Sequence, residues 1–307
     1  MKIFAKTSAA VAAFFAAFVL HAHTAIDFIP SSSAVYGHIN TKQLIAHPVF
    51  KQLVAPELNK QLAKEKLNIS VFSGSVAFAY TLSPKSTGEF RADLIFTLSR
   101  PVAANIVKRV IAKNKSNKNF RRLKFGKMIG VGFKKEWRMF AYDSRTLIFQ
   151  VAKGQSVPFI MPRPIASSPL KKFAENTVFV TANMPVLLTL FQGSIGENAN
   201  QYLADVRTPV FFANITKDNG ISFSLVMEYA TAQICTETAK RLTGMRDESV
   251  RNYPQFAALL QKINISVTNN NVLTVHAALS GDELNALVMT AKSIIELNAA
   301  QQLPQAN

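Results

Sequence analysis

The stretch AVYGHINTKQL, residues Ala34–Leu44, decides how this chain is read, because its pattern recurs in the second half as TVFVTANMPVL, residues Thr177–Leu187. Each stretch predicts a strand that ends at an asparagine and runs directly into a helix. Asn40 and Asn183 stand where the helix N-cap falls, and an asparagine side-chain oxygen can accept a hydrogen bond from a free N–H of the first turn. The recurrence predicts two halves of similar organisation.

Three further segments share a second pattern, an alternating strand followed almost at once by an amphipathic helix. They are RADLIFTLSRPVAANIVKRVIAK (91–113), GISFSLVMEYATAQICTETAKRL (220–242) and NVLTVHAALSGDELNALVMTAKSII (271–295). Another predicted strand precedes each of them, and the KDNG and TNNN turns are strong hairpin signals because asparagine and glycine tolerate positive φ. The near-identical KLNISV (66–71) and KINISV (262–267) are predicted to be equivalent strands in a unit of helix, β-hairpin and helix.

These patterns predict an α+β fold, with antiparallel β-hairpins, helices packed on one sheet face, and an internal duplication into two similar halves. Four prolines in SVPFIMPRPIASSP oppose both helix and central strand, so residues 157–169 are assigned as an extended connector. The first half then spans residues 23–156 and the second spans residues 170–303. A basic, β-rich extension at 120–151 is predicted for the first half alone.

The N-terminus has the order of a secretory signal peptide. Lys2 and Lys6 precede an apolar run from Ser8 to Leu20, and small residues follow in HAHTA. Residues 1–22 are therefore predicted to be a signal peptide, and the protein is expected to be exported to a periplasm or the extracellular space. No later segment offers eighteen or so uncharged apolar residues, so no transmembrane segment is expected in the mature chain.

The opening of the predicted mature chain, FIPSSSAVYGHINTKQLIAHPVFKQLV (Phe28–Val54), resembles the start of uncharacterised exported bacterial proteins. These share a proline, small residues, a strand that ends in Asn or Asp, and a leucine-containing helix. The resemblance implies an exported α+β protein with a duplicated hairpin-helix organisation. It brings no catalytic residues to this sequence.

Catalytic motifs do not emerge from the chain. Beyond the HAHTA cleavage region the chain has only His38, His47 and His276, without metal-ligand spacing, so no metal or cofactor is expected. Cys235 is the only cysteine, and its apolar surroundings predict a buried, inert thiol. One SxxK pair, Ser168–Lys171, lacks the partner motifs of serine acyl enzymes, and Ser168 is better explained as a helix N-cap. We lean against an enzyme, and the catalytic residues of any hydrolase activity are not identified.

Charge is the strongest functional signal. The formal net charge is +17, or +15 without Lys2 and Lys6, which favours anionic partners. Between Lys108 and Lys135 the sequence has no acidic residue, and aromatic residues are interspersed among the cations. The segment 108–138 is therefore the candidate anion-binding region. Its candidate residues are Arg121, Arg122, Lys124, Lys127, Lys134, Lys135 and Arg138.

Three interpretations of this signal stay open. The first is non-catalytic binding of an anionic surface or polymer, such as anionic lipid, lipopolysaccharide or acidic polysaccharide; nucleic acid is not expected. The second is a carrier of a hydrophobic ligand or lipid, suggested by the many phenylalanines. The third is a hydrolase. A bland alternative to all of them is a solvated hairpin whose cations keep a sheet edge from pairing. The oligomeric state stays open as well.

Overall fold

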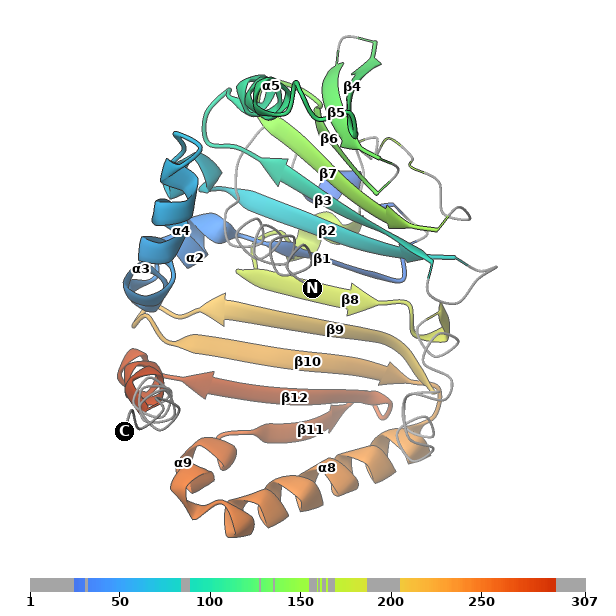
Figure 1. Cartoon of the computed structure of the whole chain (residues 1–307). Helices are drawn as coiled ribbons and strands as arrows, with labels where there is room; N and C mark the ends of the chain where they lie inside the picture. The colour runs from blue at the N-terminus through green and yellow to red at the C-terminus, as the bar shows by residue number, and fades with distance from the viewer. Residues whose placement is uncertain are drawn as a thin grey trace, which may run out of the picture.

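The strands of this chain lie in one antiparallel sheet. The computed structural model describes residues 25–30, 33–83, 89–126, 128–134, 136–154, 159, 161, 164, 169–186 and 205–290. Within these ranges the sheet has 12 strands, in the order β11-β12-β10-β9-β8-β1-β2-β3-β7-β6-β5-β4 (Figure 1). None of the helices in this part of the chain is long and apolar enough to cross a membrane. The fold class is α+β, as the sequence predicts.

The elements have the following bounds. The strands are β1 (Val35–Ile39), β2 (Ser75–Leu82), β3 (Phe90–Thr97), β4 (Phe120–Phe125), β5 (Met128–Phe133), β6 (Trp137–Ala141), β7 (Thr146–Lys153), β8 (Val178–Ala182), β9 (Val206–Ile215), β10 (Ile221–Tyr229), β11 (Asn264–Thr268) and β12 (Val272–Leu279). The α-helices with both ends in the described part of the chain are α2 (Thr41–Ala46), α3 (Pro48–Leu53), α4 (Ala55–Ala63), α5 (Ala103–Lys113), α8 (Ala232–Asn252) and α9 (Ala257–Leu260); residues 184–186 and 281–290 are helical as well. Short 3₁₀ helices are η1 (Ala25–Phe28), η2 (Ile69–Phe72), η3 (Pro169–Phe173) and η4 (Pro254–Phe256).

The two recurrent stretches meet at the centre of the sheet. Their strands, β1 and β8, pair with each other antiparallel, with Gly37 opposite Val180. Both predicted caps are confirmed: Asn40 Oδ1 accepts the Gln43 N–H at 3.4 Å, and Asn183 Oδ1 accepts the Val186 N–H at 3.4 Å. The sheet therefore continues without a break from one half to the other. The internal duplication stays a prediction.

The pairing register assigns every strand residue to one of two faces, because paired residues in an antiparallel sheet point to the same side. We call face A the side that carries Gly37 and its cross-strand neighbours Phe78 and Val180. Face B is the opposite side, which carries His38 and Asp93. Alternation along each strand makes face A mainly apolar.

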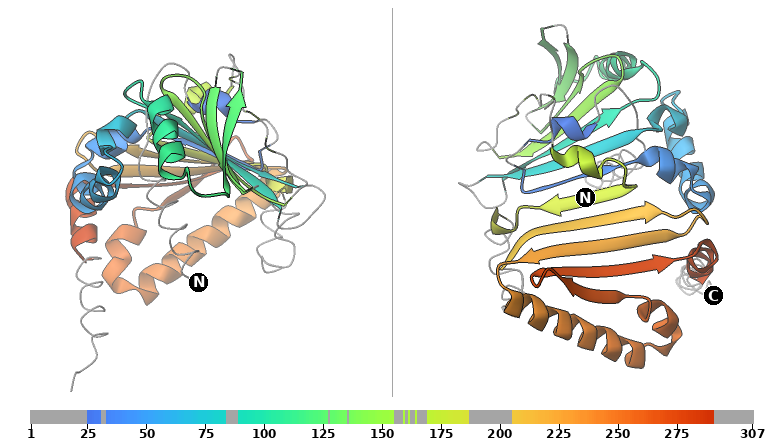
Figure 2. Two further views of the ribbon diagram at one scale, coloured as in Figure 1. Left: turned by 45° about the horizontal axis from the view of Figure 1, so that its top comes forward. Right: turned by 180° about the vertical axis from the view of Figure 1, so that it is seen from behind.

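The helices cover the two faces unequally. α5 packs on face A over buried side chains of β3, β5, β6 and β7, and α8 packs on face A near Met227, Tyr229 and Leu273. Helices α2 to α4 lie beside the ends of the strands (Figure 1). From behind, η1 and η3 lie over face B of the first half (Figure 2). The expectation of α-helices on one sheet face thus holds for α5 and α8, while η1 and η3 take the other face.

The predicted equivalence of KLNISV and KINISV is wrong. Residues 264–268 form the edge strand β11, but residues 69–72 form the 3₁₀ helix η2. Asn68 Oδ1 accepts the Ser70 N–H at 2.8 Å, and Asn59 Oδ1 accepts the Ile69 N–H at 3.1 Å, so these backbone groups are satisfied without a sheet partner. Val71 and Phe72 are buried in the core beneath α5, which favours the compact turn over an extended strand. The first strand of that hairpin is instead β2.

His47 links the two halves at the end of the strands. Its Nδ1 accepts the Val49 N–H at 3.3 Å and so caps α3, while its Nε2 lies 2.8 Å from the Asn219 carbonyl oxygen in the β9–β10 turn. With Nδ1 as acceptor, Nε2 carries the proton and donates to that carbonyl. The ring is buried, at 7% exposure.

Replacing His47 with alanine should lower the free energy of unfolding by about 1–2 kcal/mol, the usual cost of a lost N-cap together with a lost hydrogen bond. Urea denaturation would measure the change. His276→Ala is the control, because His276 is exposed and bonds only Ser224 among the described residues. Equal effects of the two substitutions would contradict a role of His47 in joining the halves.

Candidate functional site

The β4–β5 hairpin forms one edge of the sheet and carries most of the predicted basic site (Figure 1). The two strands pair from Phe120 opposite Phe133 to Phe125 opposite Met128. Gly126 follows β4 with a φ of +56°, a left-handed conformation that favours glycine at a tight turn. Phe125, beside this turn, is 40% exposed and packs edge-on against Phe140, with ring centroids 5.1 Å apart.

The structure divides the predicted cations of β4 between the two faces. Arg122 and Lys124 point to face A, whereas Arg121 points to face B. All three side chains are exposed, and within the described residues none of them forms an ion pair. Lys127 and Lys135 lie outside the described residues. An edge strand with unpaired cations on both sides can meet an anionic surface, but it does not form a pocket around one small anion.

The remaining two predicted cations already have partners. Lys134 Nζ lies 3.6 Å from a Glu136 carboxylate oxygen and 5.5 Å from the centre of the Phe133 ring. Arg138 lies on face B with its guanidinium 4.1 Å from the centre of the Phe159 ring. Partial burial lowers the pKa of Arg138 below its ordinary value. These two residues therefore stabilise the hairpin region locally, and the free cations are those of β4.

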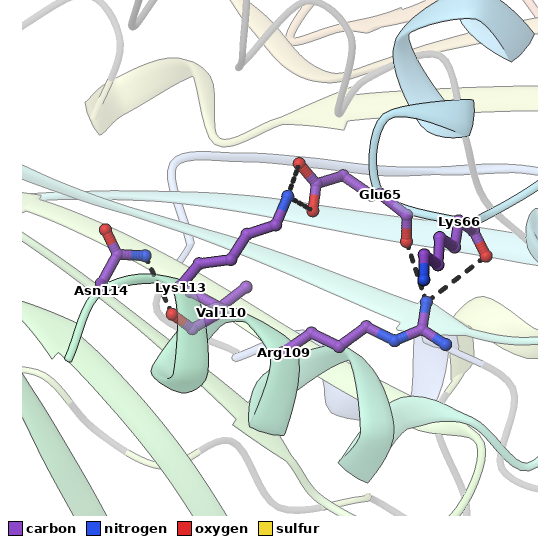
Figure 3. Close-up of polar contacts among 6 residues, drawn as sticks. All are labelled: Glu65, Lys66, Arg109, Val110, Lys113 and Asn114. Atoms are coloured by element: carbon purple, nitrogen blue, oxygen red, sulfur yellow. Dashed lines mark hydrogen bonds and ion pairs between the residues drawn. The ribbon is translucent and has the colours of Figure 1, made fainter.

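Two cations of α5, Arg109 and Lys113, serve the fold (Figure 3). Arg109 Nη1 donates to the carbonyl oxygens of Glu65 at 2.8 Å and Lys66 at 3.3 Å, and Lys113 Nζ lies 2.6 Å from the Glu65 carboxylate. Lys66 has a φ of +53°, an uncommon conformation for a residue with a side chain. Arg109 and Lys113 thus hold the turn after α4 in place, as structural charges at a helix C-terminus would.

A buried ion pair lies on face B, and the sequence analysis did not single it out. Arg91 Nε donates to Asp93 Oδ2 at 2.9 Å, and Gln150 Nε2 donates to Asp93 Oδ1 at 2.6 Å. The exposed fractions are 2% for Arg91 and 0% for Asp93. Burial raises the pKa of Asp93, although Arg91 and Gln150 act in the opposite direction. The one sequence signal was a pair of charges inside the otherwise apolar strand RADLIFTL.

Two further ionisable residues, Cys235 and Glu283, have structural roles. In the part of the chain that is described, no group of three or more His, Cys, Asp or Glu residues is placed to hold a metal ion. Cys235 is buried, as predicted, and burial raises the pKa of its thiol. Glu283 accepts the Ser280 N–H at 2.9 Å, and its hydrogen bond from Lys262 is the main reason that its pKa falls to about 2. Ser168 lies outside the described residues.

Comparison with known proteins adds little to this geometry. No family model matches the chain, and no curated protein matches it. Among solved structures it is similar to crystal form I of TP0453, with 10% sequence identity, a TM-score of 0.47, and coverage of 88% of this chain and 98% of that one. Crystal form IV of TP0453 gives 10% identity and a TM-score of 0.47, with 87% and 97% of the two chains covered. A likeness this distant says nothing about function, so the assignment below depends on the site itself.

Proposed function

We propose that this chain is an exported, non-catalytic protein that binds anionic lipid surfaces through the β4–β5 hairpin. The observation that supports this is the exposure of Arg121, Arg122 and Lys124 on an edge strand, without an ion pair among the described residues. Cations near an anionic membrane gain about 1 kcal/mol each from the surface potential. Export is itself part of the proposal, since it depends on the predicted signal peptide.

The exposed Phe125 favours a lipid surface over an acidic polymer. It lies at the turn between β4 and β5, on face B like Arg121, and 40% of its surface is exposed. An aromatic ring beside cations is the arrangement by which peripheral proteins enter the headgroup region, because the ring gains contact with hydrocarbon while the charges stay among the headgroups. A polysaccharide offers no comparable hydrocarbon layer. Lipopolysaccharide and anionic phospholipid share both features.

The triple variant Arg121→Ser, Arg122→Ser, Lys124→Ser should bind vesicles that contain anionic phospholipid roughly tenfold more weakly than the parent. The loss of three cations that all contacted the membrane would weaken binding by more than tenfold. Arg121 points away from Arg122 and Lys124, however, so all three cannot meet one flat surface equally. Vesicle flotation at low salt measures the affinity, and added salt should weaken the parent more than the variant.

The matched control is Lys51→Ser, Lys217→Ser, Lys240→Ser, which removes the same charge from exposed positions on other elements. It should keep most of the parent's binding. Equal loss in the two triple variants would show that net charge alone drives binding, and it would overturn the hairpin assignment. Phe125→Ser separates the lipid from the polymer, since it should weaken vesicle binding and leave heparin binding unchanged.

A further inference from the structure

Face A carries charge of only one sign. In the paired register of the 12 strands, its charged positions are Arg122 and Lys124 on β4 and Lys153 on β7, and none is acidic. The acids nearest in sequence to these edges, Glu89 and Glu136, precede β3 and β6 and are not in the paired register. The apolar face therefore ends in cations at its β4 edge and at the end of β7.

A strip of half-buried apolar side chains crosses face A at right angles to the strands. It follows one row of paired residues through eight neighbouring strands, from the β4 edge to β8. The members of this strip, which we call the acyl strip, are Phe120, Phe133, Trp137, Val151, Ala92, Tyr80, Val35 and Ala182. At about 4.8 Å between strands it is roughly 34 Å long. The strip is therefore longer than the hydrocarbon layer of one bilayer leaflet, which is about half of a 30 Å core, and is long enough to lie along an acyl chain.

The acyl strip lies beside α5. In the row next to it, Val131 and Met139 are 1% and 2% exposed, because they belong to the core that α5 covers. Trp137 and Phe133, two residues away along the same strands, are only half-buried. The helix thus protects one part of the apolar face and leaves the strip along its side in partial contact with solvent.

Aromatic rings form the wall of the strip near the β4 edge. The Phe120 ring lies 5.1 Å from Phe133 and 5.6 Å from Trp137, measured between ring centroids, and Trp137 lies 5.6 Å from Phe149. Further along, Tyr80 stacks on Phe90 at 5.0 Å, and Phe90 is paired with Lys153. A cation therefore lies next to the strip on face A, where it could meet the head of a bound amphiphile.

We infer that the acyl strip binds the hydrocarbon chain of a single anionic lipid molecule, with Lys153 as the cation available to its headgroup. The apolar row supplies the contact for the chain, and the one-sided charge selects an anionic head over a cationic one. A second copy of this chain fits less well, because two such faces would bring cations of like charge together. The site does not use Arg121, Arg122 or Lys124, so it can fail while the proposed function stands.

Trp137 makes the inference directly measurable, because it is the only tryptophan in the sequence. Bromine on an acyl chain quenches tryptophan fluorescence on contact. We expect a brominated stearate, added to the full chain below its micelle concentration, to quench Trp137 saturably. The corresponding brominated alcohol, which lacks the negative charge, should bind more weakly.

Two variants place a carboxylate in the strip, Ala92→Glu and Val151→Glu, each paired in register with the Trp137 row. Either should weaken stearate binding at least about 10-fold, equivalent to about 1.4 kcal/mol. Ala278→Glu adds the same charge at an exposed position on face B and should leave binding unchanged. The use of two variants keeps the test decisive if one of them does not fold.

Three results would overturn the inference. One is the absence of saturable quenching in the parent, and another is equal affinity in the parent and in both folded strip variants. The third is a dimer in light scattering that Ala92→Glu converts to a monomer without any lipid-dependent quenching, which would assign the strip to a second copy. Loss of vesicle binding in the hairpin variant with stearate quenching retained would show that the two sites act separately.

Discussion

Replacing Gly37 with alanine should destabilise the protein by at least about 3 kcal/mol, the upper range for overpacking in a buried site. A Cβ at this position would lie 2.4 Å from the Phe179 backbone oxygen and 2.5 Å from Cζ of the Phe78 ring. The ring could turn away, but the oxygen belongs to β8, which pairs with β1 at the centre of the sheet. The substitution would therefore push apart the two strands that join the halves.

The control for Gly37→Ala is the same substitution at Gly244, inside α8, where a new Cβ meets nothing within 4 Å. Gly244→Ala should stabilise the protein slightly, by up to about 1 kcal/mol, because alanine loses less conformational entropy in a helix. Urea denaturation of both variants would give changes of opposite sign. A small effect at Gly37 would mean that β8 can shift without loss of the sheet.

Acidification from about pH 6.5 to about pH 4 should remove about 3 kcal/mol of stability through His38 alone. His38 is 2% exposed on face B, its Nδ1 has no hydrogen-bond partner among the described residues, and burial lowers its pKa from 6.5 to about 4. The folded state thus holds the ring neutral while the unfolded chain takes up a proton at its ordinary pKa. Stability is fully present above 6.5 and falls with pH through this window, at 1.36 kcal/mol per pKa unit.

The measurement compares the pH dependence of unfolding free energy in the parent and in His38→Gln, which cannot take a proton. Above pH 6.5 the variant should be no more stable than the parent. Between about pH 6.5 and about pH 4 its free energy of unfolding should fall by about 3 kcal/mol less than that of the parent. Asp93, whose pKa burial raises, is present in both proteins, so its contribution cancels. Parallel curves for the two proteins would contradict the assignment to His38.

Part of the candidate site follows from the sequence because strand periodicity is local. The alternation in FRRLKF predicts that Arg122 and Lys124 share one face and Arg121 the other, and the register agrees. The acyl strip could not be predicted in the same way. Its members come from eight strands, and the first and last of them along the sequence, Val35 and Ala182, are 147 positions apart. Only the pairing order of the strands brings them into one row. Trp137 had no sequence signal beyond its place among basic residues.

The buried ion pair of Arg91 and Asp93 shows a second limit of the sequence. An alternating strand with a charge at either end of RAD suggests solvent on face B, yet η1 packs over β2 and β3 and η1 residues are buried with Ile95. The segment η1, which is distant in sequence from β3, packs on face B there and makes that part of the face buried. The hydrogen bonds from Arg91 and Gln150 then satisfy a carboxylate that the sequence alone places in water.

The sequence by itself determined what depends on neighbouring residues: the α+β class, the alternation that separates faces A and B, and the asparagine caps of both recurrent stretches. These follow from backbone geometry and from hydrogen bonds that reach three residues. The tertiary structure decided what depends on distant partners, namely that β1 pairs with β8. It also decided that KLNISV turns while the similar KINISV extends. The physical reason is that six similar residues have the same local preference, and burial beneath α5 or a free place beside β12 selects between a turn and a strand.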